Sequence, residues 1–142
     1  MNVGILALQG DFREHGKVVE KLGNSTRLVR RPDELDSVDG LIIPGGESTT
    51  ISKLLKKWGL FDPIREKADE GFPIFGTCAG LILLAKEVMD GPDTLGLLNI
   101  SVERNAYGRQ IESFESELEF ATNGDNVDGA GKFTGVFIRA PQ

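Results

Sequence analysis

The stretch FPIFGTCAGLILLA, residues 72–85, contains the only cysteine of the 142-residue chain. A short apolar run leads into GTCAG (76–80), and a second apolar run follows it. A brief apolar run that stops at a glycine is typical of a buried parallel strand. The pattern therefore predicts that Cys78 lies at a corner between a strand and a helix that covers residues 79–89.

The residues before this stretch alternate between two kinds of pattern. Strand patterns lie at 2–8, 26–30 and 39–46, and helical patterns lie at 11–23, 48–57 and 60–70. The first helix opens on Asp11, which together with Glu14 resembles a capping box. Strands that alternate with helices predict an α/β fold, in which a mostly parallel sheet carries helices on both faces.

After Gly91-Pro92 the pattern changes to longer alternating stretches. Apolar residues interleaved with acids at 111–120 and an apolar run at 133–139 predict strands of a later antiparallel section. A turn-rich segment, 123–132, joins them as a surface hairpin loop. A chain of this length suits one core, so we expect a single domain over residues 1–142.

Charge and composition exclude several classes of partner. The net charge of −6 and the pI near 4.8 argue against nucleic acid, because phosphate binding requires a concentrated basic face. No apolar run approaches the roughly 20 residues that span a bilayer, and no targeting signal is visible, so we expect no membrane partner. One cysteine and one histidine cannot form a disulfide or a structural zinc site, which favours the reducing cytoplasm. We expect neither a metal nor a cofactor.

The corner at Cys78 suggests nucleophilic chemistry, although a lone cysteine can also be a small buried apolar side chain. Small-x-Cys-x-Gly between a strand and a helix is the thiol counterpart of the nucleophile elbow, where a strained turn exposes the reactive atom. Cys78 would also precede a helix N-terminus, whose unpaired N–H groups favour a thiolate. The N–H of Ala79 would point to where an acyl oxyanion develops, and losing such a donor costs about 3 kcal/mol of barrier.

A second loop could supply another donor. The strand at 39–46 ends in Pro44-Gly45-Gly46, and ligands gather at the carboxyl ends of strands in open α/β sheets. Two glycines let the backbone approach a substrate closely. The alternative is an ordinary strand-to-helix turn, capped by Ser48 or Thr49.

Five blocks of sequence together resemble one family: LALQGDFREH, VDGLIIPGGESTT, FGTCAGLILLAKE, LGLLNISVERNAYGRQIESFE and FTGVFIRAP. They look like the glutaminase subunits of pyridoxal 5′-phosphate synthase, which are class I (triad) glutamine amidotransferases. The resemblance implies a flavodoxin-like three-layer α/β sandwich. It also implies that L-glutamine is hydrolysed to glutamate and ammonia, and that the ammonia passes to a (β/α)₈-barrel synthase subunit.

The resemblance also implies roles for individual residues. Cys78 would form a glutamyl thioester, and the N–H groups of Gly46 and Ala79 would bind the oxyanion. The positions that match substrate contacts are Gly45, Gly46, Glu47, Arg104, Ile138 and Arg139. For Arg104 the alternative is a salt bridge, for example to Glu103, and for Arg139 a purely structural role stays equally open. Gln9 and His15 match the rim that faces the synthase.

The thioester mechanism needs a general base, which the family supplies from a His-x-Glu segment after the last strands. The only histidine here is His15, in the polar run Arg13-Glu14-His15, which predicts a surface or interface contact rather than a base. We therefore expect either a shortened version of a longer protein, apparently without its C-terminal segment, or a short form with little activity. A non-catalytic subunit that binds glutamine or the synthase, and a cysteine hydrolase on the same fold, remain alternatives.

Overall fold

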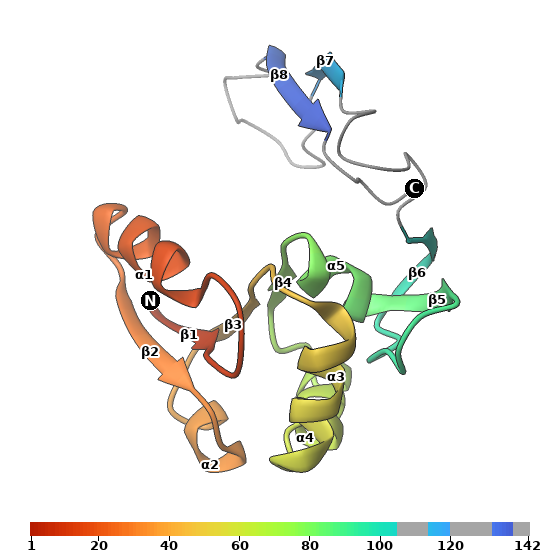
Figure 1. Cartoon of the computed structure of the whole chain (residues 1–142). Coiled ribbons are helices and arrows are strands. Elements are labelled where there is room, and N and C mark those ends of the chain that lie inside the picture. The colour runs from red at the N-terminus through yellow and green to blue at the C-terminus, as the bar shows by residue number, and fades with distance from the viewer. Residues whose placement is uncertain (105–113, 120–131, 138–142) are drawn as a thin grey trace. The chain divides into compact units, whose positions relative to one another are not determined.

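The computed structural model describes residues 1–104 together with the backbone of two later strands, at 114–119 and 132–137 (Figure 1). The chain divides into two compact units, Met1–Val102 and Glu103–Gln142. The first unit contains the corner at Cys78 and most of the predicted site. In the part of the chain that the structure describes, no helix is long and apolar enough to cross a membrane.

The first unit is built on a four-stranded parallel sheet. Its strands are β1 (Asn2–Leu6), β2 (Ser25–Val29), β3 (Gly40–Ile43) and β4 (Ile74–Gly76), in the order β2-β1-β3-β4. Register places Ile5 opposite Ile42, and Ile43 opposite Gly76. The four predicted strands and their parallel pairing are thus confirmed, and their carboxyl ends meet at one edge of the sheet.

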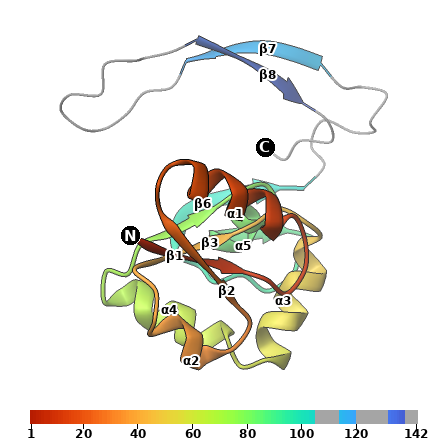
Figure 2. The same cartoon turned by 90° about the vertical axis from the view of Figure 1, so that its left-hand side faces the viewer.

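Five helices accompany the sheet in this unit: α1 (Phe12–Lys21), α2 (Pro32–Leu35), α3 (Ser48–Lys57), α4 (Phe61–Asp69) and α5 (Ala79–Leu84). Figure 2 shows α1 over one face of the sheet, and α2 and α4 under the other. The main core lies on the second face, where side chains of β1 and β3 pack with those of the helices: Leu6, Leu41, Ile43, Leu35, Ile51, Leu55, Leu60, Ile64 and Leu83. The predicted α/β class with helices on both faces is confirmed.

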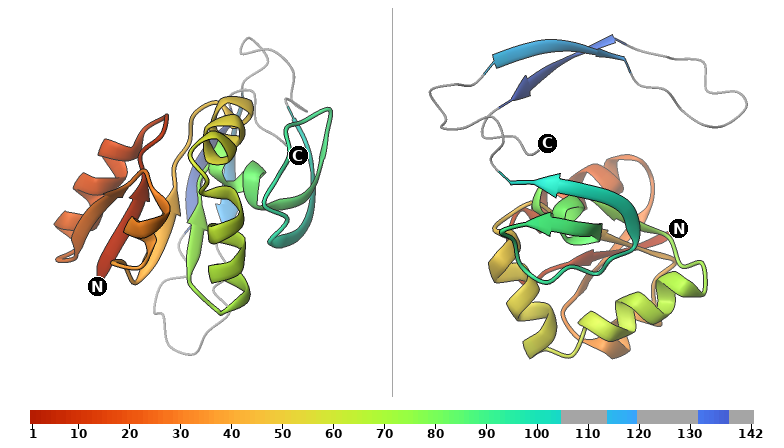
Figure 3. Two further views of the ribbon diagram at one scale, coloured as in Figure 1. Left: turned by 90° about the horizontal axis from the view of Figure 1, so that it is seen from below. Right: turned by 90° about the vertical axis from the view of Figure 1, so that its right-hand side faces the viewer.

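The helix predicted over 79–89 is wrong in its second half. It ends at Leu84, and β5 (Ala85–Met89) follows and pairs with β6 (Leu98–Glu103), as Figure 3 shows. The carbonyls of Leu83 and Leu84 would accept bonds from the next turn of a longer helix. They accept instead from the backbone N–H groups of Leu95 and Leu97, at 2.7 and 2.9 Å. The returning chain therefore ends the helix.

The second unit contains an antiparallel pair, β7 (Phe114–Glu119) and β8 (Lys132–Phe137), in which Phe114 lies opposite Phe137. These strands confirm the antiparallel section that was predicted for the later part of the chain. The loop predicted at 123–132 and the ends of both predicted strands lie largely outside the described residues.

Candidate active site

Cys78 occupies a strained corner between β4 and α5. Its φ is 50° and its ψ is −113°, a region that residues with a Cβ rarely adopt, and its side chain is exposed. Holding a residue in such a region costs of order 1–3 kcal/mol, and such strain concentrates at functional sites. The exposure contradicts the alternative that Cys78 is a buried apolar side chain.

The two glycines that flank this corner are required by space. A Cβ on Gly76 would lie 2.7 Å from the carbonyl carbon of Gly80, and a Cβ on Gly80 would lie 2.0 Å from the carbonyl oxygen of Ile43. Both distances are far inside ordinary contact, and both neighbours are backbone atoms that cannot rotate away. The corner therefore needs a residue without a side chain on each side of Cys78.

Backbone hydrogen bonds fix the corner to the sheet and to the helix. The N–H of Thr77 donates to the carbonyl of Ile43 at 3.1 Å, so the corner continues the pairing of β4 with β3. The N–H of Gly80 donates to the carbonyl of Thr77 at 2.8 Å, and that of Ile82 donates to the carbonyl of Cys78 at 3.1 Å. Ala79, the predicted oxyanion donor, follows Cys78 directly as the first residue of α5 and is buried.

The loop after β3 lies beside Cys78, as the sequence predicts. A Cβ on Gly45 would lie 3.3 Å from the Cβ of Cys78 and 3.2 Å from Oδ1 of Asp11. Gly45 is buried and Gly46 is exposed. Loops after β1, β3 and β4 meet here because these strands are neighbours in a parallel sheet.

The loop after β1 holds this glycine pair in place. Gly10 has a φ of 101°, and a Cβ there would lie 1.9 Å from the carbonyl oxygen of Gly45. That oxygen accepts a hydrogen bond from the N–H of Asp11 at 3.2 Å. The side-chain oxygen of Gln9 accepts from the N–H of Glu47 at 2.9 Å. Gln9, predicted only as a partner-facing residue, is therefore also a support of the glycine loop.

Asp11 does occupy the N-cap position of α1, but its side chain makes no capping bond. The predicted capping box is therefore wrong. The backbone N–H of Asp11 is directed to Gly45 instead, so this residue ties the start of the helix to the candidate site.

Glu47 provides the cap of α3. Its carboxylate accepts hydrogen bonds from the N–H of Thr49 at 3.0 Å and from the N–H and hydroxyl of Thr50, both at 2.7 Å. The hydroxyl of Thr50 has the largest effect and the N–H of Thr49 the next, and together they lower the pKa of Glu47 to about 2. The alternative cap by Ser48 or Thr49 is wrong, and the side chain of Ser48 is buried.

His15 is half-buried and lies beside the corner. Its Nε2 is 2.9 Å from the hydroxyl oxygen of Thr77, the residue before Cys78. Sequence reasoning missed this contact, because the two residues are 62 positions apart and no local pattern links them. The role of His15 at a partner interface stays a prediction.

The described structure does not test the remaining predicted site residues. Arg104 belongs to the second compact unit, and Ile138 and Arg139 lie outside the described residues. Their assignment to the substrate therefore stays a prediction.

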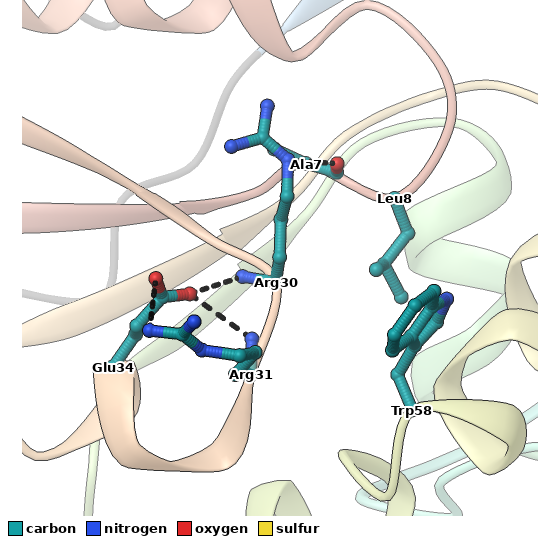
Figure 4. Close-up of a pocket in the computed structure, with 6 residues that line it drawn as sticks. All are labelled: Ala7, Leu8, Arg30, Arg31, Glu34 and Trp58. Carbon is teal, nitrogen blue, oxygen red and sulfur yellow. Dashed lines mark hydrogen bonds and ion pairs between the residues drawn. The ribbon is translucent and has the colours of Figure 1, made fainter.

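A separate cavity of about 450 Å³ lies next to Ala7 and Leu8, the residues that directly follow β1 (Figure 4). Its lining consists of Ala7, Leu8, Arg30, Arg31, Glu34 and Trp58. The N–H groups of Arg30 and Arg31 donate to the carboxylate of Glu34 at 2.7 and 3.0 Å, and the bond from Arg30 does most to lower the pKa of Glu34. This lining offers guanidinium groups and an indole rather than a nucleophile, so the corner at Cys78 stays the candidate active site.

Comparison with known proteins agrees with this arrangement. Residues 5–142 match the family model described as the SNO glutamine amidotransferase family. A protein of Thermosipho africanus named "Pyridoxal 5'-phosphate synthase subunit PdxT" is 54% identical over 144 residues, covering 100% of this chain and 73% of its own length. A protein of the same name from Pelotomaculum thermopropionicum is 53% identical over 142 residues, covering 99% of this chain and 70% of its own length.

Solved structures show the same relationship. A chain titled "Crystal structure of glutamine amidotransferase" superimposes with a TM-score of 0.83 at 52% identity, covering 98% of this chain and 71% of that one. A putative peptidase E protein from Listeria monocytogenes has a TM-score of 0.58 at 18% identity, over 69% of this chain and 63% of that one, and shares the fold alone. On these matches, the chain belongs to the SNO glutamine amidotransferase family.

Proposed function

We propose that Cys78 is the nucleophile of a glutaminase that converts L-glutamine to glutamate and ammonia. One observation carries this proposal: an exposed thiol at a positive φ, with Gly45 against its Cβ. The strain at Cys78 and the crowding at its flanking glycines are the features of a turn that presents a reactive atom. Membership of a glutamine amidotransferase family gives the substrate.

The proposed reaction has two stages. The sulfur attacks the side-chain amide carbon of glutamine, and the carbon–nitrogen bond then breaks to leave a glutamyl thioester. The departing nitrogen takes up the proton that the thiol lost and leaves as ammonia. Water then cleaves the thioester, which yields glutamate and restores the thiol.

Two backbone N–H groups are proposed to stabilise the oxyanion of each stage, those of Gly46 and Ala79. Ala79 is fixed by its place at the start of α5, and Gly46 by the contacts that Gln9 and Gly10 make with its loop. Donors held rigidly in advance stabilise developing charge without reorganising during the reaction. Support from Gln9 is therefore part of the proposed catalytic arrangement.

The substrate is proposed to lie along the glycine loop and to be held by Gly45, Gly46, Glu47, Arg104, Ile138 and Arg139. A guanidinium such as that of Arg104 suits the carboxylate of glutamine, because it can form a two-pronged hydrogen bond. The hydrogen bonds between Thr50 and Glu47 support this proposal by holding the loop against α3.

The ammonia is proposed to pass to a barrel-shaped synthase subunit that builds pyridoxal 5′-phosphate. The relatives support the link to a synthase, because each is named as a subunit of pyridoxal 5′-phosphate synthase. Gln9 and His15 are proposed to face that subunit, and the cytoplasm is the proposed setting. Turnover needs a general base, which the family resemblance assigns to a His-x-Glu segment.

The test compares wild type with Cys78→Ala in a protein that includes the His-x-Glu segment, with the synthase present. Glutamate and ammonia are measured, and mass spectrometry follows labelling by an electrophilic glutamine analogue. We expect one label per chain on Cys78, and loss of both labelling and turnover in the variant, while its thermal unfolding confirms that it folds. Ammonia release by Cys78→Ala at the wild-type rate would show that the assignment is wrong. Binding of the synthase without any glutamate formation by wild type would instead favour a non-catalytic subunit.

A further inference from the structure

The side chain of His15 links helix α1 to the corner that holds Cys78. The Nε2 atom of His15 lies 2.9 Å from Oγ1 of Thr77, and both side chains are half-buried. A hydroxyl group can both donate and accept a hydrogen bond, so the contact can form with either tautomer of the imidazole. The bond links α1 to the residue directly before Cys78.

Thr77 is held from three directions. Its N–H donates to Ile43 at the end of β3, its carbonyl accepts from Gly80 in α5, and its hydroxyl meets His15 of α1. The first two contacts are backbone bonds that any residue except proline could make at position 77. The third contact needs the hydroxyl of Thr77 and the imidazole of His15, so it depends on which residues occupy these two positions.

The orientation of Thr77 bears directly on the geometry of the thiol. The φ of Cys78 is the rotation about its N–Cα bond, measured from the peptide unit that it shares with Thr77, and it has the strained value of 50°. A residue in such a conformation relaxes unless its surroundings hold it. Contacts that fix Thr77 fix this peptide plane, and thereby oppose relaxation of the corner.

We propose that His15 is a positioning residue for Cys78, which acts by anchoring the hydroxyl of Thr77. The proposal deepens the proposed function, because it assumes that Cys78 is the nucleophile, and it assigns His15 no proton transfer. It differs from the interface role predicted for His15, because a positioning role acts within this chain and persists when the partner is saturating.

The test uses the complete glutaminase with saturating synthase. His15→Ala and Thr77→Val each remove the bond, Thr77→Ser keeps the hydroxyl, and Lys21→Ala changes an exposed residue at the far end of the same helix. Steady-state kinetics give kcat and KM for glutamine. The rate of alkylation by iodoacetamide reports on the Cys78 thiol without requiring turnover. Cys78 is the only cysteine in residues 1–142, and any further cysteine of the protein used in the test is replaced by serine.

We expect His15→Ala and Thr77→Val each to lower kcat by about five- to tenfold, the worth of one hydrogen bond, with KM within about twofold of wild type. Alkylation slows by a similar factor, and Thr77→Ser and Lys21→Ala behave as wild type. The double variant His15→Ala/Thr77→Val is no slower than either single variant, because both remove the same contact.

Three results would overturn the proposal. The first is that His15→Ala retains the wild-type kcat and alkylation rate, and the second is that His15→Ala and Thr77→Val lower kcat additively. The third is that the loss of kcat in His15→Ala disappears as the synthase concentration rises, which would identify His15 as a docking contact. If wild type itself forms no glutamate, the proposed function fails. The alkylation rates then decide the positioning role by themselves.

Discussion

Replacement of Gly80 by alanine separates two opposing effects at the corner that holds Cys78. Gly80 is a helical residue of α5, and helix propensity alone predicts that alanine stabilises such a position by about 1 kcal/mol. Packing predicts the opposite, because the new Cβ would lie 2.0 Å from the carbonyl oxygen of Ile43 and 3.1 Å from its Cγ2. Relief of that overlap needs a shift of roughly 1.5 Å between two backbone segments.

The expected change in the free energy of unfolding follows from the contacts that this shift disrupts. Overpacking of a tight site costs about 1–3 kcal/mol. The carbonyl that must move also accepts the N–H of Thr77, a bond with a net worth of about 1 kcal/mol. After the gain in helix propensity is subtracted, we expect Gly80→Ala to lower the free energy of unfolding by roughly 2 kcal/mol.

Urea denaturation followed by far-UV circular dichroism measures this change, and Gly16→Ala is the matched control. Gly16 lies inside α1, and a Cβ there would meet only Cδ1 of Ile5, at an ordinary 3.6 Å. That substitution should therefore stabilise the protein by about 0.5–1 kcal/mol. If Gly80→Ala proves as stable as wild type, the close approach of α5 to β3 does not hold the corner and this reasoning is refuted.

Two further predictions concern Glu47. Glu47→Ala removes the cap of α3 and should lower the free energy of unfolding by about 1 kcal/mol, measured by urea denaturation; no change would refute the capping role. Because the pKa of Glu47 is lowered from 4.5 to about 2, its carboxylate contributes stability that is fully present above pH 4.5. This contribution to the free energy of unfolding is lost as the pH falls toward 2. The excess of the wild-type Tm over that of Glu47→Gln should therefore shrink across this range, and a constant difference would contradict the assignment.

Features that depend on neighbouring residues could be predicted from the sequence. The helix predicted over 48–57 matches α3 (Ser48–Lys57) at both ends, and the apolar run before Gly76 does form a strand. The corner at Cys78 was predictable for the same reason, because small residues on both sides of one cysteine are a local pattern. Local spacing therefore located both the sheet and the edge at which Cys78 lies.

Features that depend on distant partners could not be predicted. The end of α5 is set by bonds from Leu95 and Leu97, which no helical periodicity in 79–89 reveals. The contact of His15 with Thr77 and that of Gln9 with Glu47 span 62 and 38 positions. Such pairs are chosen by the three-dimensional arrangement of the loops, so the supports of the site appeared only in the structure.

The arrangement of β1, β3 and β4 as adjacent parallel strands also bears on how the protein folds. Gly10, Gly45 and Cys78 meet only when three segments widely separated in sequence have paired. Parallel pairing over such separations is slow, because long loops must close before the contacts that stabilise them can form. During refolding, the surroundings of the Cys78 thiol are therefore complete only after β4 has joined the sheet, and the rate at which this thiol is alkylated can time that step.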